Sequence, residues 1–251
     1  MDQALSTAEQ DYLKNIYTLE HECGRATTQA LATRLGVKAA SVTAMVKRLA
    51  EDATGPYLTH TPYHGMELTA RGHAVALEVL RHHRLLELYL AEHLGVPWDQ
   101  VHAEAERLEH VISEDLEERI AAKLGQPTRD PHGDPIPSRD GVMDETDGVP
   151  LTELSVGASA TLSRVPDGDP ALLQYLGTLG LVPGAAIVVA EVAPYGDVLH
   201  VRVGALTHAV GGPIARRVLA WPEETLIAGV PTDQTDDRQR SQEAPETAAT
   251  R

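Results

Sequence analysis

The stretch V-K-A-A-S-V-T-A-M-V-K-R-L, residues 37–49, decides the fold of the N-terminal part of this 251-residue chain. Its apolar residues recur at helical spacing, and a shorter helix is predicted just upstream, at Gln29–Leu35, with Gly36 in the turn between them. A short helix, a turn with glycine and a second helix form the helix-turn-helix pattern of many DNA-binding domains. The N-terminal residues of such a second helix meet base edges in the major groove.

The predicted second helix, Ala39–Glu51, turns its apolar residues inward and presents small or basic residues on its other face. The candidate DNA-contacting residues on that face are Lys38, Ala40, Ser41, Thr43, Ala44, Lys47 and Arg48. Alanine can only touch thymine methyl groups, so we expect limited direct base readout and a larger part for DNA shape. The two lysines, Arg48 and His64 are candidate phosphate contacts, and the alternative for each is a solvated surface residue.

Segments on either side complete a winged helix. A helix is predicted from Ser6 or Thr7 to about Glu22, and two short strands, at 57–61 and 65–68, form a hairpin. Further helices are predicted at 69–94, at Val101–Ser113 and at 114–124. Residues 126–150 are rich in Pro, Gly and Asp and are predicted to be loop and linker.

The chain changes character after Thr152. Five short strands are predicted, at 158–165, 185–193, 198–203, 206–210 and 217–220, with one helix at 170–179. Five short strands in so few residues suggest a small barrel. The last residues, 231–251, are too polar to fold alone and are expected to be disordered.

Composition limits the possible functions. The net charge of −16 argues against nonspecific nucleic-acid binding by the whole chain. The acid is concentrated in residues 76–145, which hold 7 Lys+Arg and 16 Asp+Glu, whereas residues 1–75 hold 7 and 8. Cys23 is the single cysteine, which excludes an intrachain disulfide and a thiol-rich zinc site. With no leader and no apolar run near 18 residues, we expect a cytoplasmic protein that contacts no membrane.

The predicted helix Val101–Ser113 carries potential metal ligands on one stripe. His102, Glu106, Glu109 and His110 lie at positions i, i+4, i+7 and i+8, so they share one helical face. A lone helix of this kind is more often a solvated polar face. His83 and Glu87 on the preceding helix, and Asp11 on the first helix, add further ligand types. Three helices could then converge on bound metal.

Several motifs occur along the chain in a characteristic order. They are D-Y-L-K-N-I-Y-T-L-E at 11–20, A-A-S-V-T-A-M-V-K-R-L at 39–49, L-T-A-R-G at 68–72, H-R-L-L-E at 83–87, the Glu109-His110 pair, H-G-D-P-I-P at 132–137 and L-G-T-L-G-L-V-P-G at 176–184. On these motifs the chain resembles, over residues 5–230, the diphtheria toxin repressor family of metal-activated transcriptional regulators.

The resemblance implies a mainly α chain with a small β domain. It implies a winged helix-turn-helix DNA-binding domain at 1–72, a helical metal-binding and dimerisation domain at 73–140, a linker at 141–151, an SH3-like barrel at 152–230 and a disordered tail at 231–251. The expected partners are a second copy of the chain and double-stranded DNA with a palindromic operator. The expected function is repression of metal-uptake genes.

The family's metal sites carry over by position. The resemblance implies a regulatory metal held by Asp11, Glu106, Glu109 and His110. It implies a second metal held by His83, Glu87 and His102 with an acid from the barrel, Asp169, for which Asp167 is a rival. His82, His93 and His132 match no ligand position and are expected to be surface or loop residues.

Two departures from the family pattern bear on the metal. The iron-responsive branch has methionine and cysteine where this chain has Asp11 and Glu106, and an oxygen and nitrogen donor set suits Mn²⁺ while still admitting Fe²⁺. Two-domain manganese regulators have a glutamate where this chain has Lys14, so we expect two separated sites rather than a two-metal cluster. Without metal, repulsion among Asp11, Glu106 and Glu109 is expected to raise their pKa values and loosen the first helix.

Three alternatives to a manganese-activated repressor follow from the same residues. An iron(II)-responsive regulator of the same family is the first alternative. A metalloenzyme is a weaker one, because no nucleophile or general-base motif accompanies the ligands and a helix-turn-helix has no place in it. A winged-helix regulator with a small-molecule effector and surface carboxylates is the third. We therefore expect no catalytic residues.

Overall fold

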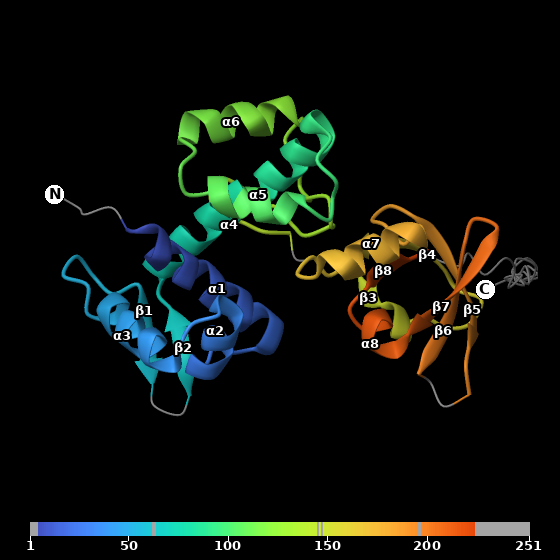
Figure 1. Ribbon diagram of the computed structural model, residues 1–251, viewed down its shortest axis with the longest axis horizontal. Coiled ribbons are helices and arrows are strands. Elements are labelled where there is room, and N and C mark those ends of the chain that lie inside the picture. The colour runs from blue at the N-terminus through green and yellow to red at the C-terminus, as the bar shows by residue number, and fades with distance from the viewer. Residues whose placement is uncertain (1–4, 62–63, 145, 147, 195–196, 224–251) are drawn as a thin grey trace, which may run out of the picture.

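The computed structural model describes residues 5–61, 64–144, 146, 148–194 and 197–223. At the N-terminal end, helices α1 (Thr7–Cys23), α2 (Thr28–Leu35) and α3 (Ala39–Ala50) pack with a hairpin of β1 (Leu58–Thr61) and β2 (Gly65–Leu68) (Figure 1). The strands pair antiparallel, with Leu58 opposite Leu68. The predicted winged helix-turn-helix is confirmed.

The ends of these helices have local causes. Ser6 and Glu9 form a reciprocal capping box that begins α1, and the Thr27 side chain accepts a hydrogen bond from the Ala30 N–H at the start of α2. Gly24 and Gly36 end α1 and α2 with φ of 71° and 65°, the left-handed conformation that glycine adopts without a steric penalty. These caps keep the two helices short and separate.

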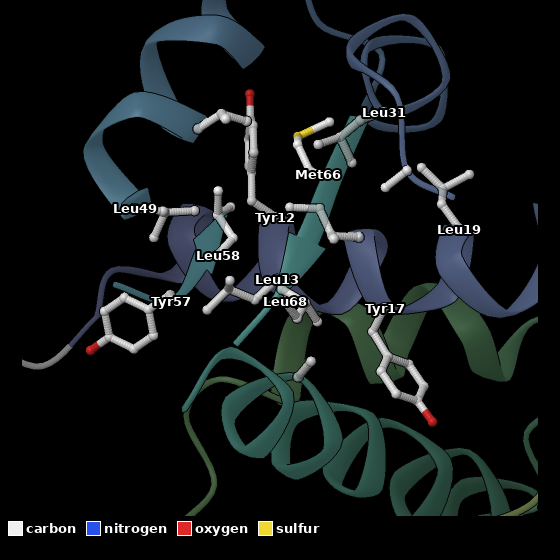
Figure 2. Close-up of a cluster of buried hydrophobic side chains, with 14 of the residues drawn as sticks. Tyr12, Leu13, Tyr17, Leu19, Leu31, Leu49, Tyr57, Leu58, Met66 and Leu68 are labelled. Atoms are coloured by element: carbon white, nitrogen blue, oxygen red, sulfur yellow. The ribbon is translucent and has the colours of Figure 1, made fainter. Parts of the chain in front are cut away.

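One apolar core holds the winged helix together. Leu13 and Ile16 of α1, Leu31 of α2 and Val42 of α3 are fully buried. Figure 2 shows Tyr12 of α1 projecting between Leu49 and Leu58 on one side and Met66 on the other, which come from α3 and the hairpin, while Leu13 lies beside Leu68. Since α1 contributes to this core along its length, α3 and the hairpin are fixed relative to α1.

The middle of the chain is helical. The long helix α4 (Ala70–Leu94) runs from the hairpin to a layer formed by α5 (Val101–Leu108) and α6 (Glu114–Lys123) (Figure 1). The prediction of one helix over Val101–Ser113 is wrong at its C-terminal end. Tight turns at Val111 and Ile112 follow Leu108, and Ser113 takes an extended conformation to cap α6, which no continuing helix allows. Glu109 and His110 therefore lie on the α5–α6 turn.

The C-terminal part is a small β domain. Its antiparallel sheet has the strand order β3-β8-β4-β5-β6-β7. The strands are β3 (Val149–Pro150), β4 (Ser159–Arg164), β5 (Ala186–Val192), β6 (Val198–Val203), β7 (Leu206–Gly211) and β8 (Leu219–Pro222). Helix α7 (Pro170–Thr178), helix α8 (Gly212–Ala215) and a 3-10 turn, η1 (Leu151–Glu153), accompany them. The five predicted strands and α7 are present; β3, η1 and α8 were not predicted.

The predicted fold class, mainly α with a small β domain, is confirmed. The β domain has a core of its own, in which Leu162, Leu173 and Val189 are buried. Gln174 of α7 donates a 2.8 Å hydrogen bond to Asp99, just before α5, so the β domain contacts the helical layer. The predicted disordered tail, 231–251, lies outside the described residues. Among the described helices, none combines the length and the apolar character that a bilayer crossing requires.

Candidate metal centres and DNA-binding face

The first group of potential ligands joins α1 to the α5–α6 turn. Asp11, Glu109 and His110 present ligand atoms that all lie within 4.8 Å of one another. His110 Nε2 lies 2.8 Å from Asp11 Oδ1 and 3.1 Å from Glu109 Oε1. Its Nδ1 donates a 2.7 Å hydrogen bond to Gln10 Oε1, which orients the ring so that Nε2 faces the carboxylates. We call this group, with Glu106, the first centre.

A lysine side chain lies within the first centre. Lys14, one turn after Asp11, places Nζ 2.7 Å from Glu106 Oε1 and 2.6 Å from Glu109 Oε1. The lysine is 6% exposed and Glu109 is 1% exposed, so this contact is largely shielded from water. The ammonium group therefore supplies the positive charge that the buried Glu109 carboxylate requires, and it also pairs with Glu106, whose side chain is 42% exposed.

The repulsion expected among the carboxylates is offset by Lys14, whose ammonium group pairs with Glu106 and Glu109. Burial alone would raise the pKa of Glu106, but the charge and hydrogen bond of Lys14 outweigh it and lower that pKa. Burial raises the pKa of Asp11, even though His110 and Lys14 act in the opposite direction. The pKa of Asp11 is thus raised mainly by burial, with repulsion from Glu109 a smaller cause, and the expected rise does not occur at Glu106.

His83 of α4 lies behind the first centre and connects it to Glu87. Its Nδ1 is 2.5 Å from Glu109 Oε2, and its Nε2 is 2.9 Å from Glu87 Oε1. Burial would lower the pKa of His83, but the Glu87 charge and the hydrogen bonds to both carboxylates raise it to about 10. A protonated ring donates to both glutamates, so His83 is a second built-in cation.

A second group of potential ligands lies where α4 meets the loop after α6 and the β domain. Glu87, His132 and Asp167 present ligand atoms within 4.8 Å of one another, and Asp130 Oδ2 lies 3.9 Å from His132 Nδ1. Glu87 Oε2, Asp130 Oδ2 and His132 Nδ1 are buried and make no hydrogen bond within the described residues. We call these four residues the second centre.

Buried polar atoms without hydrogen-bond partners destabilise a folded protein, so their presence at the second centre points to a ligand that would satisfy them. His132 Nδ1 and Glu87 Oε2 are 3.8 Å apart, too far for a hydrogen bond but suited to a cation between them. His132 Nε2 lies 2.9 Å from the Trp98 carbonyl oxygen, which only accepts, so Nε2 carries a proton and Nδ1 faces the carboxylates. Burial would lower the pKa of His132, but Asp130 and Glu87 raise it to about 9.

The structure brings only part of the predicted second site together. His83, Glu87 and His102 are in contact, with His102 Nδ1 3.1 Å from both His83 Nε2 and Glu87 Oε1. Asp169 lies elsewhere: its carboxylate caps α7 by accepting hydrogen bonds from the N–H groups of Ala171 and Leu172. Asp167, the rival acid, is the barrel residue that the structure places beside Glu87.

Two histidines expected at the surface or in loops are buried. His132 is on a loop but is 0% exposed, and His82 is 5% exposed on α4. His132 is enclosed because the 130–135 loop folds on itself: the Asp130 carboxylate accepts hydrogen bonds from the N–H groups of His132 and Asp134. His93 is exposed as expected. The Asp-x-His spacing at 130–132 was the available sequence signal.

Both centres fit a divalent cation by their donor chemistry. The first centre offers carboxylate oxygens and imidazole nitrogen without any sulfur, and the second offers the same donor types with three unpartnered buried atoms. Such donors suit Mn²⁺ and Fe²⁺ and also bind Zn²⁺. A cation at the first centre would be held by residues of two elements, Asp11 of α1 and His110 of the α5–α6 turn.

The predicted DNA-contacting residues of α3 all lie on its exposed face. Lys38, Ala40, Ser41, Thr43, Ala44, Lys47 and Arg48 are exposed. Arg48 is nevertheless engaged, because its guanidinium lies 2.6 Å from Glu9 Oε1 of α1. Its assignment as a phosphate contact is therefore less direct than that of Lys38 or Lys47, for which the described residues show no ion pair.

Comparison with known proteins agrees with this architecture. Residues 4–66 match the family model described as iron dependent repressor, N-terminal DNA binding domain. Residues 69–138 match the iron dependent repressor, metal binding and dimerisation domain, and residues 149–220 match the FeoA domain. Together these three models account for each of the three structural parts.

Individual relatives share most of the chain. The iron-dependent repressor IdeR of Mycobacterium bovis is 38% identical over 216 residues, covering 81% of this chain and 92% of that protein. A solved manganese-dependent transcriptional repressor in complex with manganese superposes with a TM-score of 0.78 at 36% identity, covering 86% of this chain and 100% of that one. The crystal structure of IdeR from T. acidophilum gives a TM-score of 0.71 at 29% identity, covering 88% and 100%.

These relatives are DNA-binding transcriptional repressors, so the metalloenzyme alternative is not supported. Iron and manganese are both represented in their names. On its domains, its two ligand groups and these matches, the chain belongs to the diphtheria toxin repressor and IdeR family of metal-dependent transcriptional repressors.

Proposed function

We propose that this protein is a manganese-activated repressor that binds palindromic operators of metal-uptake genes as a homodimer in the cytoplasm. The observation that carries the proposal is the 2.8 Å contact between Asp11 of α1 and His110 of the α5–α6 turn. Ligands from the DNA-binding domain and from the helical domain meet at one point there. Occupancy of the first centre can therefore control how the two domains are held together.

The position of α1 determines the position of the recognition helix. Glu9, two residues before Asp11, forms the 2.6 Å ion pair with Arg48 of α3. Glu20, near the other end of α1, accepts a 2.9 Å hydrogen bond from the Leu68 N–H of the wing. Together with the shared apolar core, these contacts make α1, α3 and the wing move as one body. Fixing Asp11 against His110 thus fixes the DNA-reading surface.

A bound divalent cation would supply two positive charges and directed coordination at the first centre. The proposed ligands are Asp11, Glu106, Glu109 and His110. His83, which contacts Glu109, is a further proposed ligand. Lys14 must then leave the carboxylates that it neutralises, and His83 must release a proton to coordinate. Metal binding therefore replaces the Lys14 ammonium and the His83 proton with the metal cation. The extent of this exchange depends on the metal concentration.

Manganese is proposed over iron because Asp11 and Glu106 provide oxygen donors. Mn²⁺ is well matched by carboxylate and imidazole ligands, whereas sulfur ligands favour softer metals. Fe²⁺ remains the second candidate, since the IdeR relatives are named as iron-dependent and this donor set admits it. Parallel titrations of DNA binding with Mn²⁺ and anaerobic Fe²⁺ separate the two: a manganese response at lower free-metal concentration supports the proposal.

A homodimer is supported by apolar side chains around the α5–α6 turn. Val111, Leu116 and Leu108 are 73%, 45% and 37% exposed, although the rest of the layer is strongly acidic. Exposed apolar groups in one patch are typical of a surface that a partner covers. A two-fold dimer can place its recognition helices about 34 Å apart, one turn of DNA, which is why we expect a palindromic operator.

The test is a pull-down of sheared genomic DNA by the purified protein, with manganese and with chelator, followed by sequencing. We expect enrichment of a palindromic site only with manganese, next to genes for metal uptake. An Asp11→Asn variant should lose this enrichment, whereas Asp115→Asn, which removes an exposed carboxylate on α6, should keep it. Equal enrichment with manganese and with chelator would contradict metal gating.

A further inference from the structure

A third cluster of ligand-type side chains lies between α4 and the start of α6, outside both centres. Glu78 and His82 of α4 and Glu114, the first residue of α6, present ligand atoms within 4.8 Å of one another. We call these three residues the His82 cluster. None of them is among the ligands of the first or second centre.

His82 is the member that points to a ligand. It is 5% exposed, and its Nε2 is a buried atom without a hydrogen-bond partner in the described part of the chain. Its other ring nitrogen, Nδ1, lies 3.0 Å from the backbone carbonyl oxygen of Glu109. A carbonyl only accepts, so Nδ1 carries a proton and Nε2 is the ring nitrogen that faces the cluster. Metal-binding histidines are held in this way, with one nitrogen donating to a carbonyl.

Carboxylates surround that nitrogen. Nε2 lies 3.4 Å from Glu114 Oε1 and 3.5 Å from Glu117 Oε2. Glu117 has a cationic partner, since Arg81 donates to it at 2.6 Å. Glu78 and Glu114 have no lysine or arginine ion pair among the described residues, and burial together with the Glu114 charge raises the pKa of Glu78. The cluster therefore lacks a balancing positive charge.

We propose that the His82 cluster is a third divalent-cation site, with His82 Nε2 and one carboxylate oxygen each from Glu78 and Glu114 as ligands. One imidazole with two carboxylates suits zinc or manganese, and zinc is the tighter-binding probe by the Irving–Williams order. Glu78 and Glu114 are exposed, so solvent reaches the site from the side opposite His82.

The position of the site gives it a role. His82 holds the carbonyl of Glu109, a proposed ligand of the first centre, and Glu114 begins the helix that follows the Glu109–His110 turn. A cation here would fasten α6 to α4 and stiffen that turn. Zinc in the cluster and manganese at the first centre would then change each other's affinity by the same factor.

The test counts zinc by equilibrium dialysis and mass spectrometry on the full chain, in a zinc-buffered solution. Glu78→Gln/Glu114→Gln should hold one fewer zinc per protomer than the wild type. The matched control, Glu92→Gln/Glu118→Gln, removes one exposed carboxylate from each of the same two helices and should hold as many as the wild type. The changed residues are exposed, and circular dichroism verifies that both variants fold.

A wild-type zinc content in Glu78→Gln/Glu114→Gln would overturn the third site and leave His82 as a structural neighbour of Glu114 and Glu117. The same loss of zinc in both double variants would overturn it as well, by showing that zinc is attracted by surface charge. Manganese-dependent DNA binding is measured on the same samples, since the ligands of the first centre are intact in both variants. Failure of that response in the wild type would count against the proposed function without affecting the zinc count.

Discussion

The first and second centres use the same donor types but balance their charges differently. At the first centre, Lys14 donates to both Glu106 and Glu109, and His83 donates to Glu109. At the second centre, Glu87, Asp130 and His132 each retain a buried atom with no hydrogen bond in the described chain. A cation must displace Lys14 from two carboxylates at the first centre. At the second it would replace only the His132 proton and would satisfy buried atoms that have no hydrogen-bond partner in the described chain.

This difference suggests a division of labour. A site whose carboxylates are already neutralised by internal cations binds metal more weakly. Its occupancy therefore changes with the free-metal concentration rather than staying saturated. A site with unpartnered donors gains more from metal, so we expect the second centre to fill first and to hold the β domain against α4. Glu87 belongs to the second centre and contacts His83, which contacts Glu109 of the first, so the two centres are physically connected.

Removing Lys14 should have the largest effect. In Lys14→Met the buried Glu109 carboxylate loses its ammonium partner, and we expect the metal-free protein to be destabilised by about 3 kcal/mol. Manganese should restore most of this loss and bind more tightly than to the wild type, because the lysine no longer competes for the carboxylates. Urea denaturation with chelator and with manganese measures both effects. Lys123→Met, an exposed lysine on α6, is the control.

If Lys14→Met were as stable as the wild type in chelator, the internal lysine would not be neutralising the first centre. The two centres would then not differ in how their charges are balanced.

Changing Asp11 should uncouple metal from DNA. Asp11→Asn keeps the size of the side chain but weakens the ligand that α1 contributes. A coupling of about 1–3 kcal/mol, or 5–150-fold in DNA affinity, is typical of allosteric proteins, and we expect most of it to vanish. Fluorescence anisotropy with operator DNA, at several manganese concentrations, measures the change. An unchanged manganese response would move the regulatory role away from the first centre.

The second centre can be tested by comparing two aspartates that stand two residues apart. Asp167→Asn should weaken binding of one metal equivalent by at least about tenfold, about 1.4 kcal/mol. Asp169→Asn should leave binding unchanged, and the helix as well, because asparagine caps helices about as well as aspartate. Isothermal titration with manganese provides the comparison. The opposite result would restore Asp169 as the ligand.

The smallest expected effect is a pH dependence of the metal-free protein. The pKa of His83 is raised to about 10 and that of His132 to about 9, from an ordinary value of 6.5. Their protonated forms therefore add stability that is complete below about pH 6.5 and is lost as the pH rises through 9 and 10. Each group contributes a slope of at most about 1.4 kcal/mol per pH unit.

Denaturation in chelator between pH 7 and 9 measures this slope. His132→Gln should reduce it by about half, because His83 still contributes, whereas His93→Gln, which changes an exposed histidine, should not alter it. Stability that stays constant over this range in the wild type would show that the imidazoles are neutral without metal.

Local signals predicted the fold well. The capping residues Ser6 and Thr69 begin α1 and α4 where expected, and the glycines at 24 and 95 end them. The start of α6 after Ser113 was predicted, but the C-terminal end of α5 was missed because the helical stripe continues through Glu109 and His110. Periodicity alone could not decide between a continuous helix and a turn that keeps both residues near Asp11.

The first centre was largely predictable and the second was not. Asp11, Glu109 and His110 come together as the family motifs implied, but the place of Lys14 between the carboxylates depends on packing between α1 and α5. His132 is on a loop, where the Asp-x-His spacing indicates a turn but no periodicity reveals that the ring is buried. The Asp169-Pro170 pair is by contrast a plain helix-start signal, which favoured capping over metal binding.

The most direct test of metal exchange at the first centre is anomalous diffraction at the manganese edge from crystals of the manganese-loaded protein. We expect an anomalous peak between Asp11, Glu109 and His110, with the Lys14 ammonium moved away from Glu106 and Glu109. A protein saturated with manganese that shows no peak there, and keeps Lys14 bound to both glutamates, would contradict it.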